Sequence, residues 1–325
     1  MSARVLVIGG AGYIGSVCAR VFAQAGHDVV TYDDLSTGHA AAVTGQLVEA
    51  DIRDRATLRE VLRTKPFDAV LHFAARSVVG DSVHQPAGYF DVNVAGTLGL
   101  VQEMLSAGVR RMVFSSTCAI YGTPPQLPLT EDLPFAPVSP YGETKAMVER
   151  FLELCREREG LNVTCLRYFN AAGAMPDGSL GEAHNPETHL IPLAIHAALG
   201  KRPPLKLFGT DYPTRDGTCV RDYIHVLDLA DAHLRAMDRL LEGDSGDAYN
   251  VGTGNGTTVR EVLEAVGRAA GTPVPYSDAD RRAGDPAALY AQSDKIQSAL
   301  GWVPQHTDLD DIVASAVKWA RSPRY

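Results

Sequence analysis

Short runs of apolar, often β-branched residues alternate with amphipathic stretches along the first two-thirds of the chain. Apolar runs bounded by glycine or polar residues are typical of buried strands, and apolar residues three or four apart are typical of helices. The runs predict strands at Val5–Ile8, Asp28–Tyr32, Val70–Phe73, Arg111–Ser115 and Val163–Tyr168. The amphipathic stretches predict helices at Ser16–Ala25, Ala56–Arg63, Asn93–Ala107 and Ser139–Glu157.

This alternation of strands and helices indicates the fold class. Right-handed crossovers between successive strands produce a parallel sheet that is covered by helices on both faces. We therefore predict an α/β protein: a Rossmann-type doubly wound parallel sheet with a smaller C-terminal α/β domain that binds substrate.

The amino-acid composition changes near Met175, after which Pro, Gly and Asp are more frequent. Beyond it the pattern predicts a short helix at Pro192–Leu199, a long irregular segment at Pro203–Gly217, helices at Val226–Leu241 and Val259–Ala270, and a strand at Ala248–Val251. We expect a nucleotide-binding domain at 1–174, a substrate domain made mainly of 175–325, and a return of about 218–252 to the first domain.

Composition and charge narrow the function classes. The 325 residues are 45% hydrophobic and carry a formal net charge of −9, so bulk attraction to nucleic acid or to an anionic membrane is not expected. No run of apolar residues is long enough to span a bilayer, and the N-terminus lacks the pattern of a signal peptide. Five cysteines without metal-ligand spacing disfavour a disulfide framework or zinc site, which predicts no metal and a cytoplasmic location.

A glycine-rich turn follows the first predicted strand and precedes the first predicted helix. Glycines at 9, 12 and 15 permit a tight turn and bring a helix N-terminus close to a diphosphate. Asp33 ends the second strand, 18 residues after Gly15, where a carboxylate accepts the ribose hydroxyls of adenosine and repels a 2′-phosphate. The pattern favours NAD over NADP; the alternative is a glycine turn and an unrelated surface aspartate.

Tyr141 and Lys145 are four residues apart at the start of a predicted helix and share one face of it. A nearby ammonium favours the phenolate, so Lys145 is expected to lower the pKa of Tyr141 from about 10 and make it a base. Such a pair also occurs by chance on many helices. However, Thr117 ends the preceding strand, and the glycine turn, Asp33, Ala74-Ala75, Thr117 and Asn170 all fall at carboxyl ends of predicted strands, where parallel sheets bind ligands.

These residues lie in a sequence that resembles the extended short-chain dehydrogenase/reductase family, and within it the UDP-galactose 4-epimerases. The resemblance covers essentially the whole chain, and LFGTDYPTRDGTCVRDYIHVLDLADAH (207–233) contains its most specific part. The other matching runs are GGAGYIGS (9–16), LHFAA (71–75), NVAGTL (93–98), FSSTCAIYG (114–122), SPYGETK (139–145), LRYFNAAGA (166–174), YNVGTG (249–254) and RRAGD (281–285).

The resemblance implies reversible inversion at carbon 4 of UDP-glucose and UDP-galactose, with UDP-N-acetylhexosamines as possible further substrates. Tyr141 with Thr117 would remove the 4-hydroxyl proton as a hydride passes to NAD, and Lys145 would hold the nicotinamide ribose. The cofactor-binding residues it implies are Gly9, Gly12, Tyr13, Ile14, Gly15, Asp33, Asp51, Ile52, Phe73, Ala74, Ala75, Asn93, Ser115, Tyr141, Lys145 and Tyr168. The substrate-binding residues it implies are Thr117, Asn170, Leu190, Phe208, Arg221, Tyr223, Arg282, Asp285 and Leu289.

The chain departs from the family pattern at three of these positions or their neighbours. Ser77 stands where a lysine is frequent, Thr117 where some members have serine, and Leu289 where some have tyrosine. By the family pattern, the first departure would remove one cofactor contact and the second keeps the hydroxyl. The third would enlarge the sugar pocket, so we expect room for an N-acetyl group.

Three alternatives remain beside epimerisation at carbon 4. A 4,6-dehydratase requires acids at the positions of Cys118 and Ala119, which are not acidic here, and an epimerase of another kind would use Cys118 as its acid and base. A non-catalytic NAD-sensing protein on the same fold would not require Tyr141 and Lys145. The resemblance also implies a homodimer through the helices predicted at Asn93–Ala107 and Ser139–Glu157.

Overall fold

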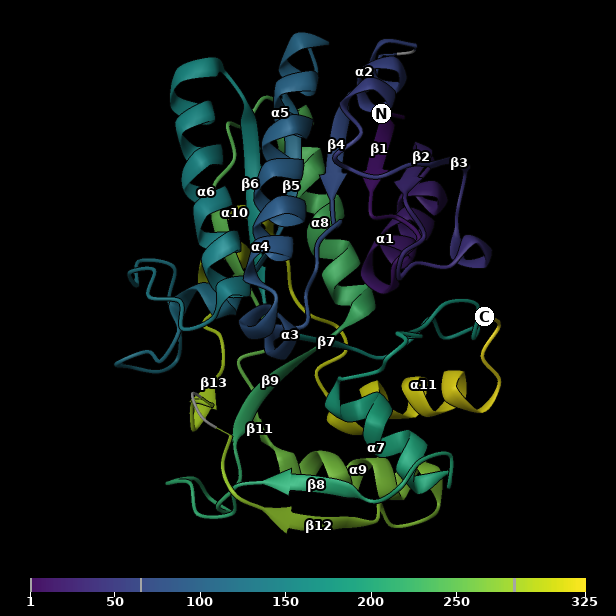
Figure 1. The fold of residues 1–325 in the computed structure, drawn as a ribbon, viewed down its shortest axis with the longest axis vertical. Coiled ribbons are helices and arrows are strands. Elements are labelled where there is room, and N and C mark those ends of the chain that lie inside the picture. The colour runs from purple at the N-terminus through teal and green to yellow at the C-terminus, as the bar shows by residue number, and fades with distance from the viewer. Residues whose placement is uncertain (1, 65, 283–284) are drawn as a thin grey trace.

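A parallel sheet of seven strands forms the centre of the larger half of the protein in a computed structural model, which describes residues 2–64, 66–282 and 285–325 (Figure 1). Its strands are β1 (Arg4–Ile8), β2 (Asp28–Asp33), β3 (Gln46–Glu49), β4 (Ala69–His72), β5 (Arg111–Thr117), β6 (Asn162–Tyr168) and β10 (Ala248–Val251). Their order is β10-β6-β5-β4-β1-β2-β3, and every neighbouring pair is parallel. The predicted fold class is confirmed.

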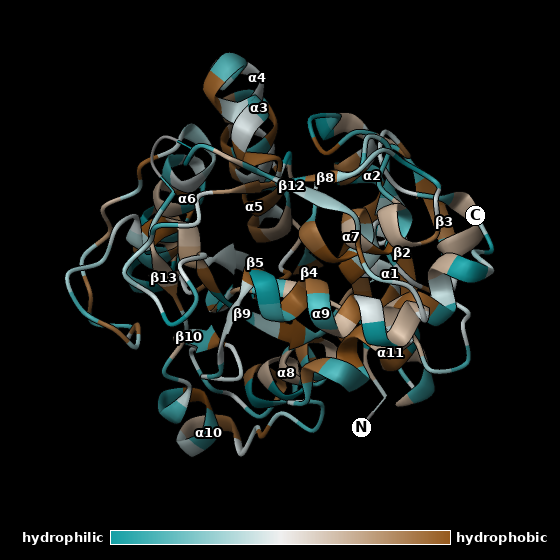
Figure 2. Ribbon diagram, turned by 90° about the horizontal axis from the view of Figure 1, so that it is seen from below, coloured by the Kyte–Doolittle hydropathy of each residue, from teal (hydrophilic) through white to brown (hydrophobic). Residues whose placement is uncertain are grey.

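Helices cover both faces of this sheet because successive strand residues point to opposite sides. Val5 and Val7 pack on one face, beneath α1 (Tyr13–Gln24) and α8 (Val226–Leu241). Leu6 and Ile8 pack on the other face, which is covered by α2 (Arg55–Thr64), α5 (Thr97–Ser106) and α6 (Pro140–Glu159). In Figure 2 the elements around the centre are largely hydrophobic, and hydrophilic residues lie mainly in the outer loops.

The smaller half, in the lower part of Figure 1, contains two small sheets and a group of helices. The four-stranded sheet is formed by β7 (Asn170–Ala172), β9 (Val220–His225), β11 (Gly256–Thr258) and β13 (Ala288–Leu289). The two-stranded sheet is formed by β8 (Leu205–Phe208) and β12 (Tyr276–Ala279). Helices α7 (Leu190–Ala198), α9 (Val259–Ala270) and α11 (Leu309–Arg321) share a separate apolar core.

The remaining elements connect these two halves or lie beside the sheet. They are the 3-10 turns Ala40–Ala42 and Cys118–Tyr121, the short helices α3 (Val79–His84) and α4 (Pro86–Tyr89), a π-helical segment at Phe90–Gly96, and α10 (Asp294–Leu300). Within the described residues, no helix combines the length and the apolar character that a membrane crossing requires.

The structure corrects two of the predicted elements. The segment 203–217 is not irregular throughout, because β8 lies within it and pairs with β12. The predicted helix Asn93–Ala107 begins in the π-helical segment and becomes α-helical only at Thr97. Two late elements lie against the first sheet: α8 packs on it, and β10 forms its edge next to β6. The predicted division into two domains stays a prediction.

Candidate active site

The glycine-rich turn between β1 and α1 is fitted tightly against the rest of the sheet. Gly9 has φ +80°, and a Cβ on it would lie 2.4 Å from the backbone nitrogen of Ala74. A Cβ on Gly15 would lie 2.2 Å from the carbonyl oxygen of Gly9. At Gly12, by contrast, the nearest described atom would be 3.5 Å away, so this side of the turn is open to a ligand.

The first turn of α1 provides donors beside this open side. None of the described side chains caps the helix, whose N-cap is Gly12. The unpaired backbone N–H groups of a helix N-terminus and its dipole favour a diphosphate, so the turn fits NAD. Tyr13 and Ile14 are the first two residues of this helix, and the phenol of Tyr13 is anchored by donating to the Gly173 carbonyl at 2.7 Å.

Asp33 lies beside the turn, at the end of β2. Its two carboxylate oxygens accept from the backbone N–H groups of Ala11 and Leu35, each at 2.9 Å, and the residue is 8% exposed. Burial raises the pKa of this carboxyl, and the two backbone donors oppose the shift. The carboxylate is therefore held in one orientation beside Gly38, as a ribose partner requires; its binding role stays a prediction.

Asp51 and Ile52 follow β3 on the far side of Asp33. The Asp51 carboxylate accepts from the backbone N–H and Nε of Arg53 at 2.7 and 2.9 Å, which lowers its pKa. Ile52 is 6% exposed, and a Cβ on Gly96 would lie 2.9 Å from its Cγ2. Both residues are thus positioned by protein contacts at the edge predicted to hold the adenosine.

The loop after β4 contains Phe73, Ala74 and Ala75. Arg76 follows them, and its backbone is hydrogen-bonded to the side chain of Asn93. The Phe73 and Ala74 N–H groups donate to the Ile8 carbonyl at 2.7 and 3.1 Å. Asn93 accepts from the Arg76 N–H at 2.8 Å and donates to the Arg76 carbonyl at 3.0 Å and to the Thr144 hydroxyl at 3.1 Å. Since its amide is engaged within the protein, Asn93 positions this loop against α6.

Tyr141 and Lys145 extend from the first turns of α6. The Ser139 hydroxyl caps this helix by accepting from the Gly142 N–H at 3.2 Å, and Pro140 begins it. Lys145 is 3% exposed, and its Nζ donates to the Ser115 carbonyl at 2.8 Å. Thr117, at the end of β5, lies near enough to the Tyr141 phenol for its hydroxyl to lower the pKa of that phenol, and it accepts from the Ala119 N–H at 3.2 Å. The structure therefore brings all three predicted catalytic residues together.

The electrostatics of this group differ from the prediction. Burial raises the pKa of Tyr141 above its ordinary value, and the hydrogen bond with Thr117 opposes the shift only in part. Burial also lowers the pKa of Lys145 to about 8, against the attraction of Glu149. The expected lowering of the Tyr141 pKa by Lys145 is wrong for the protein alone, because the ammonium faces a carbonyl and desolvation dominates.

Ser115 and Tyr168 complete the catalytic end of the sheet. Their hydroxyl groups are hydrogen-bonded to each other, across the parallel strands β5 and β6. The rings of Tyr168 and Phe73 flank His233, with centroid distances of 6.1 and 4.8 Å. Burial lowers the pKa of His233 to about 4, so the imidazole is neutral at pH 7 and these rings form an uncharged wall.

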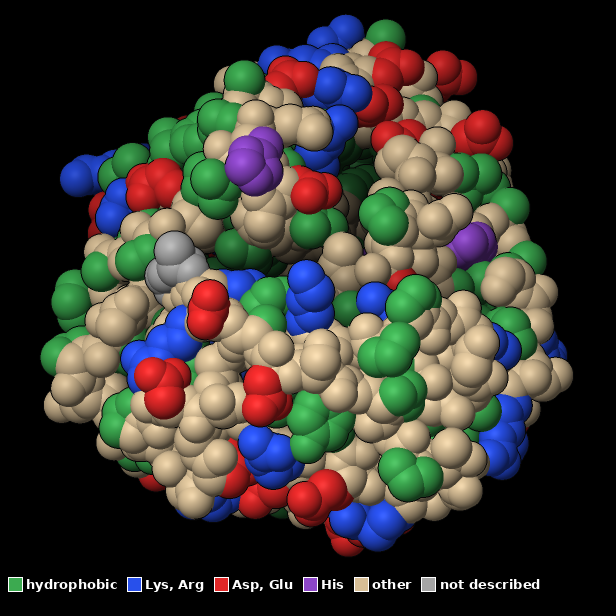
Figure 3. Space-filling model, turned by 60° about the horizontal axis from the view of Figure 1, so that its bottom comes forward, with side chains coloured by type: hydrophobic (Ala, Val, Ile, Leu, Met, Phe, Trp, Pro, Cys, Tyr) green, Lys and Arg blue, Asp and Glu red, His purple; other side chains and the backbone are tan. Residues whose placement is uncertain are grey.

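Two arginines and an aspartate form a second polar group in the smaller half. Arg221 Nη2 donates to Asp285 at 2.7 Å, and Arg282 Nη2 donates to the other oxygen of the same carboxylate at 2.8 Å. The guanidinium carbon of Arg282 lies 5.1 Å from the centroid of the Phe208 ring. Figure 3 shows a hollow in this face of the molecule, with Lys and Arg side chains along its rim. Arginines held by a single carboxylate are suited to exchange it for a diphosphate.

The other predicted substrate residues lie along the ladder of β7, β9 and β13 or at the start of α7. Asn170 pairs with Tyr223 in register and donates to the Asp222 carbonyl at 3.0 Å. Leu289 pairs with Arg221 and packs, partly buried, against the apolar cluster around Ile120. The other two are Tyr223, which is 7% exposed, and Leu190, which begins α7.

The structure also bears on the positions that distinguished the alternatives. Burial raises the pKa of the Cys118 thiol to about 12, although the charge of Arg221 opposes the shift. A thiol with this pKa does not act as a base at neutral pH. Neither Cys118 nor Ala119 is acidic, so the acids that a dehydratase would need at these two positions are lacking. Ser77, where a lysine near the cofactor is frequent in the family, is exposed.

Three buried charged residues behind the site were not predicted from the sequence. Asp222, fully buried, accepts from the Thr253 N–H and hydroxyl at 3.0 and 2.7 Å, from the Gly254 N–H at 3.0 Å and from the Ala291 N–H at 3.1 Å. Glu149 pairs with Arg167 at 2.7 Å, and both side chains are at most 7% exposed. The spacing of Glu149, one helical turn after Lys145, is a signal that could have identified it; no local signal identifies Asp222.

The chain is similar in sequence to a known protein family and to characterised members of it. Residues 5–252 match the model of the NAD dependent epimerase/dehydratase family. The UDP-glucose 4-epimerase of Rhizobium meliloti is 54% identical over 317 residues, which are 97% of this chain and 96% of that protein.

Solved structures show the same likeness over nearly the whole chain. The crystal structure of UDP-glucose 4-epimerase from Brucella ovis in complex with NAD has a TM-score of 0.96 at 47% identity, covering 98% of this chain and 99% of that one. The structure of the enzyme from Bifidobacterium longum in complex with NAD+ and UDP has a TM-score of 0.94 at 36% identity, covering 98% of each chain.

Proposed function

This chain belongs to the NAD dependent epimerase/dehydratase family, and we propose that it is an isomerase that interconverts UDP-galactose and UDP-glucose at carbon 4 of the sugar. The observation that carries this function is the meeting of the hydroxyl pair Thr117–Tyr141 with buried Lys145 at the carboxyl end of β5. The arginine pair Arg221 and Arg282 supplies the second requirement, a site for a diphosphate.

NAD is the cofactor that the glycine turn and Asp33 fit. The open side of Gly12 and the first turn of α1 would hold its diphosphate, and Asp33 the adenosine ribose. Asp51 and Ile52 would border the adenine, while Phe73–Ala75, Ser115, Tyr168 and Lys145 would surround the nicotinamide half. When bound, NAD accepts a hydride from carbon 4 of the sugar and later returns it.

The chain's own residues manage the proton. Thr117 and Tyr141 form a hydroxyl pair through which the proton of the sugar 4-hydroxyl is taken up and later returned. Lys145, one helical turn further along α6, would supply a positive charge that favours the phenolate against the opposing effect of burial. Between the two transfers the sugar must present its opposite face, so it turns about its diphosphate linkage while the nucleotide stays fixed.

The smaller half of the protein would hold the nucleotide in place. Arg221 and Arg282 would exchange their shared partner Asp285 for the diphosphate, which frees this carboxylate for the uridine ribose. Phe208, 37% exposed beneath Arg282, offers an apolar face to the uracil. Asn170, Leu190, Tyr223 and Leu289 would then border the sugar.

A homodimer is supported by the outer surface of α6. Met147 and Leu154, seven residues apart on one face of this helix, are 39% and 59% exposed. Helix α5 lies beside α6 at the same side of the molecule in Figure 1. Two such helix pairs would bury these residues in a two-fold interface. Light scattering of the parent and of Met147→Lys tests this assembly, and a monomeric parent contradicts it.

A cytoplasmic location is supported by the cysteines, since Cys18, Cys118, Cys155, Cys165 and Cys219 are all unpaired.

The test of the function is turnover without added cofactor. We expect the purified chain to convert UDP-galactose to an equilibrium mixture with UDP-glucose, followed by nuclear magnetic resonance of the sugar anomeric proton. Denaturation of the same sample should release NAD, because a cycle that regenerates its cofactor does not need to exchange it. Bound NAD without conversion would indicate a sensor protein instead, and formation of a 4-keto-6-deoxy sugar would indicate a dehydratase.

A further inference from the structure

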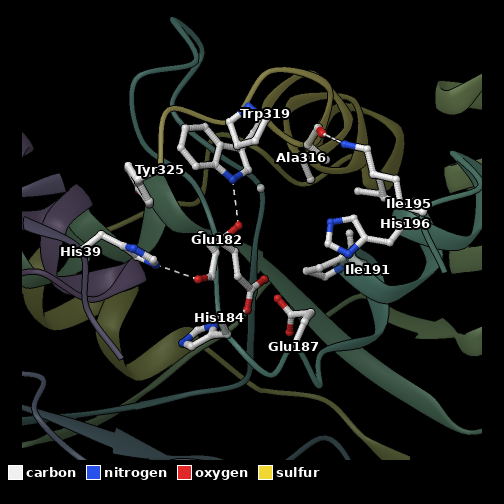
Figure 4. Close-up of a pocket in the computed structure, with 16 residues that line it drawn as sticks. His39, Glu182, His184, Glu187, Ile191, Ile195, His196, Ala316, Trp319 and Tyr325 are labelled. Atoms are coloured by element: carbon white, nitrogen blue, oxygen red, sulfur yellow. Dashed lines mark hydrogen bonds and ion pairs between the residues drawn. The ribbon is translucent and has the colours of Figure 1, made fainter. Parts of the chain in front are cut away.

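Two carboxylates and two imidazoles converge in the loop between β7 and α7, just before Leu190 and on the same side as Tyr13. They are Glu182, His184, Glu187 and His189, and one potential ligand atom from each lies within 4.8 Å of all the others. The prediction of no metal rested on the spacing of the cysteines, and the Glu-x-His-x-x-Glu-x-His pattern of these four residues contains none. Figure 4 shows Glu182, His184 and Glu187 gathered at one side of a cavity of about 210 Å³.

Three of the distances among these atoms are slightly shorter than those in a ligand shell, and the others are at most 4.8 Å. His184 Nδ1 and His189 Nδ1 lie 3.1 and 2.7 Å from the same oxygen, Glu182 Oε1, and His189 Nδ1 lies 2.9 Å from Glu187 Oε1. In a tetrahedral zinc site with bonds of about 2.0–2.1 Å, neighbouring ligand atoms are about 3.3 Å apart. We propose that Glu182, His184, Glu187 and His189 form a binding site for a divalent transition-metal cation, for which Zn²⁺ is the probe.

Hydrogen bonds alone leave this cluster poorly matched. The Nδ1 atom of an imidazole carries at most one hydrogen, and His189 Nδ1 faces two carboxylate oxygens, of which it can serve only one well. Both carboxylates are largely removed from water, with side chains 7% and 9% exposed for Glu182 and Glu187. A cation between the four groups would satisfy both carboxylates and leave each imidazole as a neutral ligand. Mixed nitrogen and oxygen donors of this kind suit Zn²⁺ and neighbouring transition metals.

The backbone around the cluster is already fixed by other parts of the chain. The Trp319 indole donates to the Glu182 carbonyl at 2.8 Å, and His39 Nε2 lies 2.8 Å from the Ala183 carbonyl oxygen. The Gly181 N–H donates to the Tyr325 hydroxyl at 3.2 Å, and a Cβ on Gly181 would lie 2.4 Å from Trp319 Cγ. This support gives the ligand groups a defined position before any ion arrives.

The place of the site in the fold indicates a structural role for the ion. The cavity is lined from α7, from α11 and its C-terminal continuation, and by His39 of the first half, and its described lining includes none of the candidate active-site residues. His189 directly precedes Leu190, the first residue of α7. A bound cation would therefore fasten the 182–189 loop to the start of that helix. Metal binding itself does not depend on the proposed epimerase activity.

The experiment measures Zn²⁺ binding by the full chain without a polyhistidine tag. After treatment with a chelator and gel filtration, we expect titration calorimetry with ZnCl₂ to show one site per chain. Loss of one ligand should weaken binding at least about 100-fold, since even outer partners contribute about 10–100-fold. The variants are Glu182→Gln and His189→Asn, and the matched control is His196→Asn, a histidine that lines the same cavity outside the cluster.

Co²⁺ provides a readout on the parent protein that needs no variant. Four-coordinate Co²⁺ absorbs strongly in the visible region, whereas six-coordinate Co²⁺ absorbs weakly, so an intense spectrum displaced by one equivalent of Zn²⁺ supports the site. NAD content and circular dichroism show whether each variant is folded. Absence of binding, a weak Co²⁺ spectrum, or equal affinity in the ligand variants and the control would each overturn the proposal, leaving a group of ion pairs.

Discussion

Lys145 beside β5 and Arg282 near β13 hold their positive charges in contrasting environments. Lys145 is 3% exposed and donates to a backbone carbonyl, whereas the Arg282 side chain is 63% exposed and pairs with a carboxylate. Near Lys145 the phenol of Tyr141 and the imidazole of His72 are uncharged at pH 7, and the buried carboxylate of Glu149 attracts the ammonium. Around Arg282 the groups Arg221 and Asp285 are charged and partly open to water.

The difference separates a fixed region from an exchangeable one. The catalytic end is assembled by strand ends and helix α6, so its hydroxyls and amine are oriented before a ligand arrives, at the cost of desolvating them. The arginine end holds partly exposed ion pairs, which contribute about 0–1 kcal/mol to stability in such settings. Its partner Asp285 can therefore give way to a diphosphate. Four predictions test this contrast.

The largest expected effect is at the fixed region. Tyr141→Phe removes the phenol while retaining the ring, so kcat for UDP-galactose should fall by about 10²–10⁴-fold, the usual contribution of a positioned acid or base. UDP binding, measured by calorimetry, should remain within about twofold because the arginine end is unchanged. A variant that retains nearly full turnover at saturating substrate would contradict the mechanism.

Substitutions in the exchangeable region, at the arginines, are expected to change KM more than kcat. Arg221→Ala or Arg282→Ala should raise KM by about 10–150-fold, since a charged hydrogen bond contributes about 1.5–3 kcal/mol, and should change kcat less. Arg281→Ala is the matched control, because its guanidinium pairs with Asp211 at 2.6 Å instead. Steady-state kinetics decide the matter, and a loss in kcat with unchanged KM would show that the arginines act on the chemistry.

Leu289 pairs with Arg221 and packs against the cluster around Ile120, so it lies between the two regions. Its size is expected to decide which sugars are accepted. We expect the parent to act on UDP-N-acetylglucosamine as well as UDP-glucose, and Leu289→Tyr to reduce only the former, by about 5–150-fold, since overpacking a filled site costs about 1–3 kcal/mol. Catalytic efficiencies for both sugars in parent and variant provide the measurement. No activity of the parent on the N-acetylated sugar would refute this, as would a tyrosine variant that keeps all of it.

The smallest effect concerns acid sensitivity of the fixed region. Burial lowers the pKa of His72 to about 3, below its ordinary value of 6.5, so between these pH values the unfolded state binds the extra proton. Stability should consequently fall as pH falls below 6.5, by up to about 1.4 kcal/mol per pH unit for this residue.

Urea unfolding at pH 7, 6 and 5, with NAD in excess, measures that slope. His72→Asn should lower stability at pH 7, because the Thr97 hydroxyl 2.8 Å from Nε2 loses its partner, yet flatten the dependence on pH. His84→Asn, at an exposed histidine of α3, should leave the slope as in the parent. An unchanged slope in His72→Asn would show that this imidazole does not govern acid sensitivity.

The sequence by itself determined the features that depend on neighbouring residues. Apolar runs such as Val5–Ile8 mark strands buried on both faces, and the serine cap with Pro140 marks the start of α6. The glycine turn was recognisable because Gly9 and Gly15 occupy positions where a Cβ would strike backbone atoms. Each of these signals operates over a few residues.

Only the tertiary structure decided which distant segments meet and which groups lose their water. The edge strand β3, half-exposed and four residues long, has too little apolar pattern to be seen, and β8 is defined by its pairing with β12. The π-helical segment holds Asn93 against Arg76 and Thr144, which no local signal encodes. The raised pKa of Tyr141 and the convergence of Glu182 with His189 likewise depend on burial and long-range packing, because desolvation is a property of the folded surroundings.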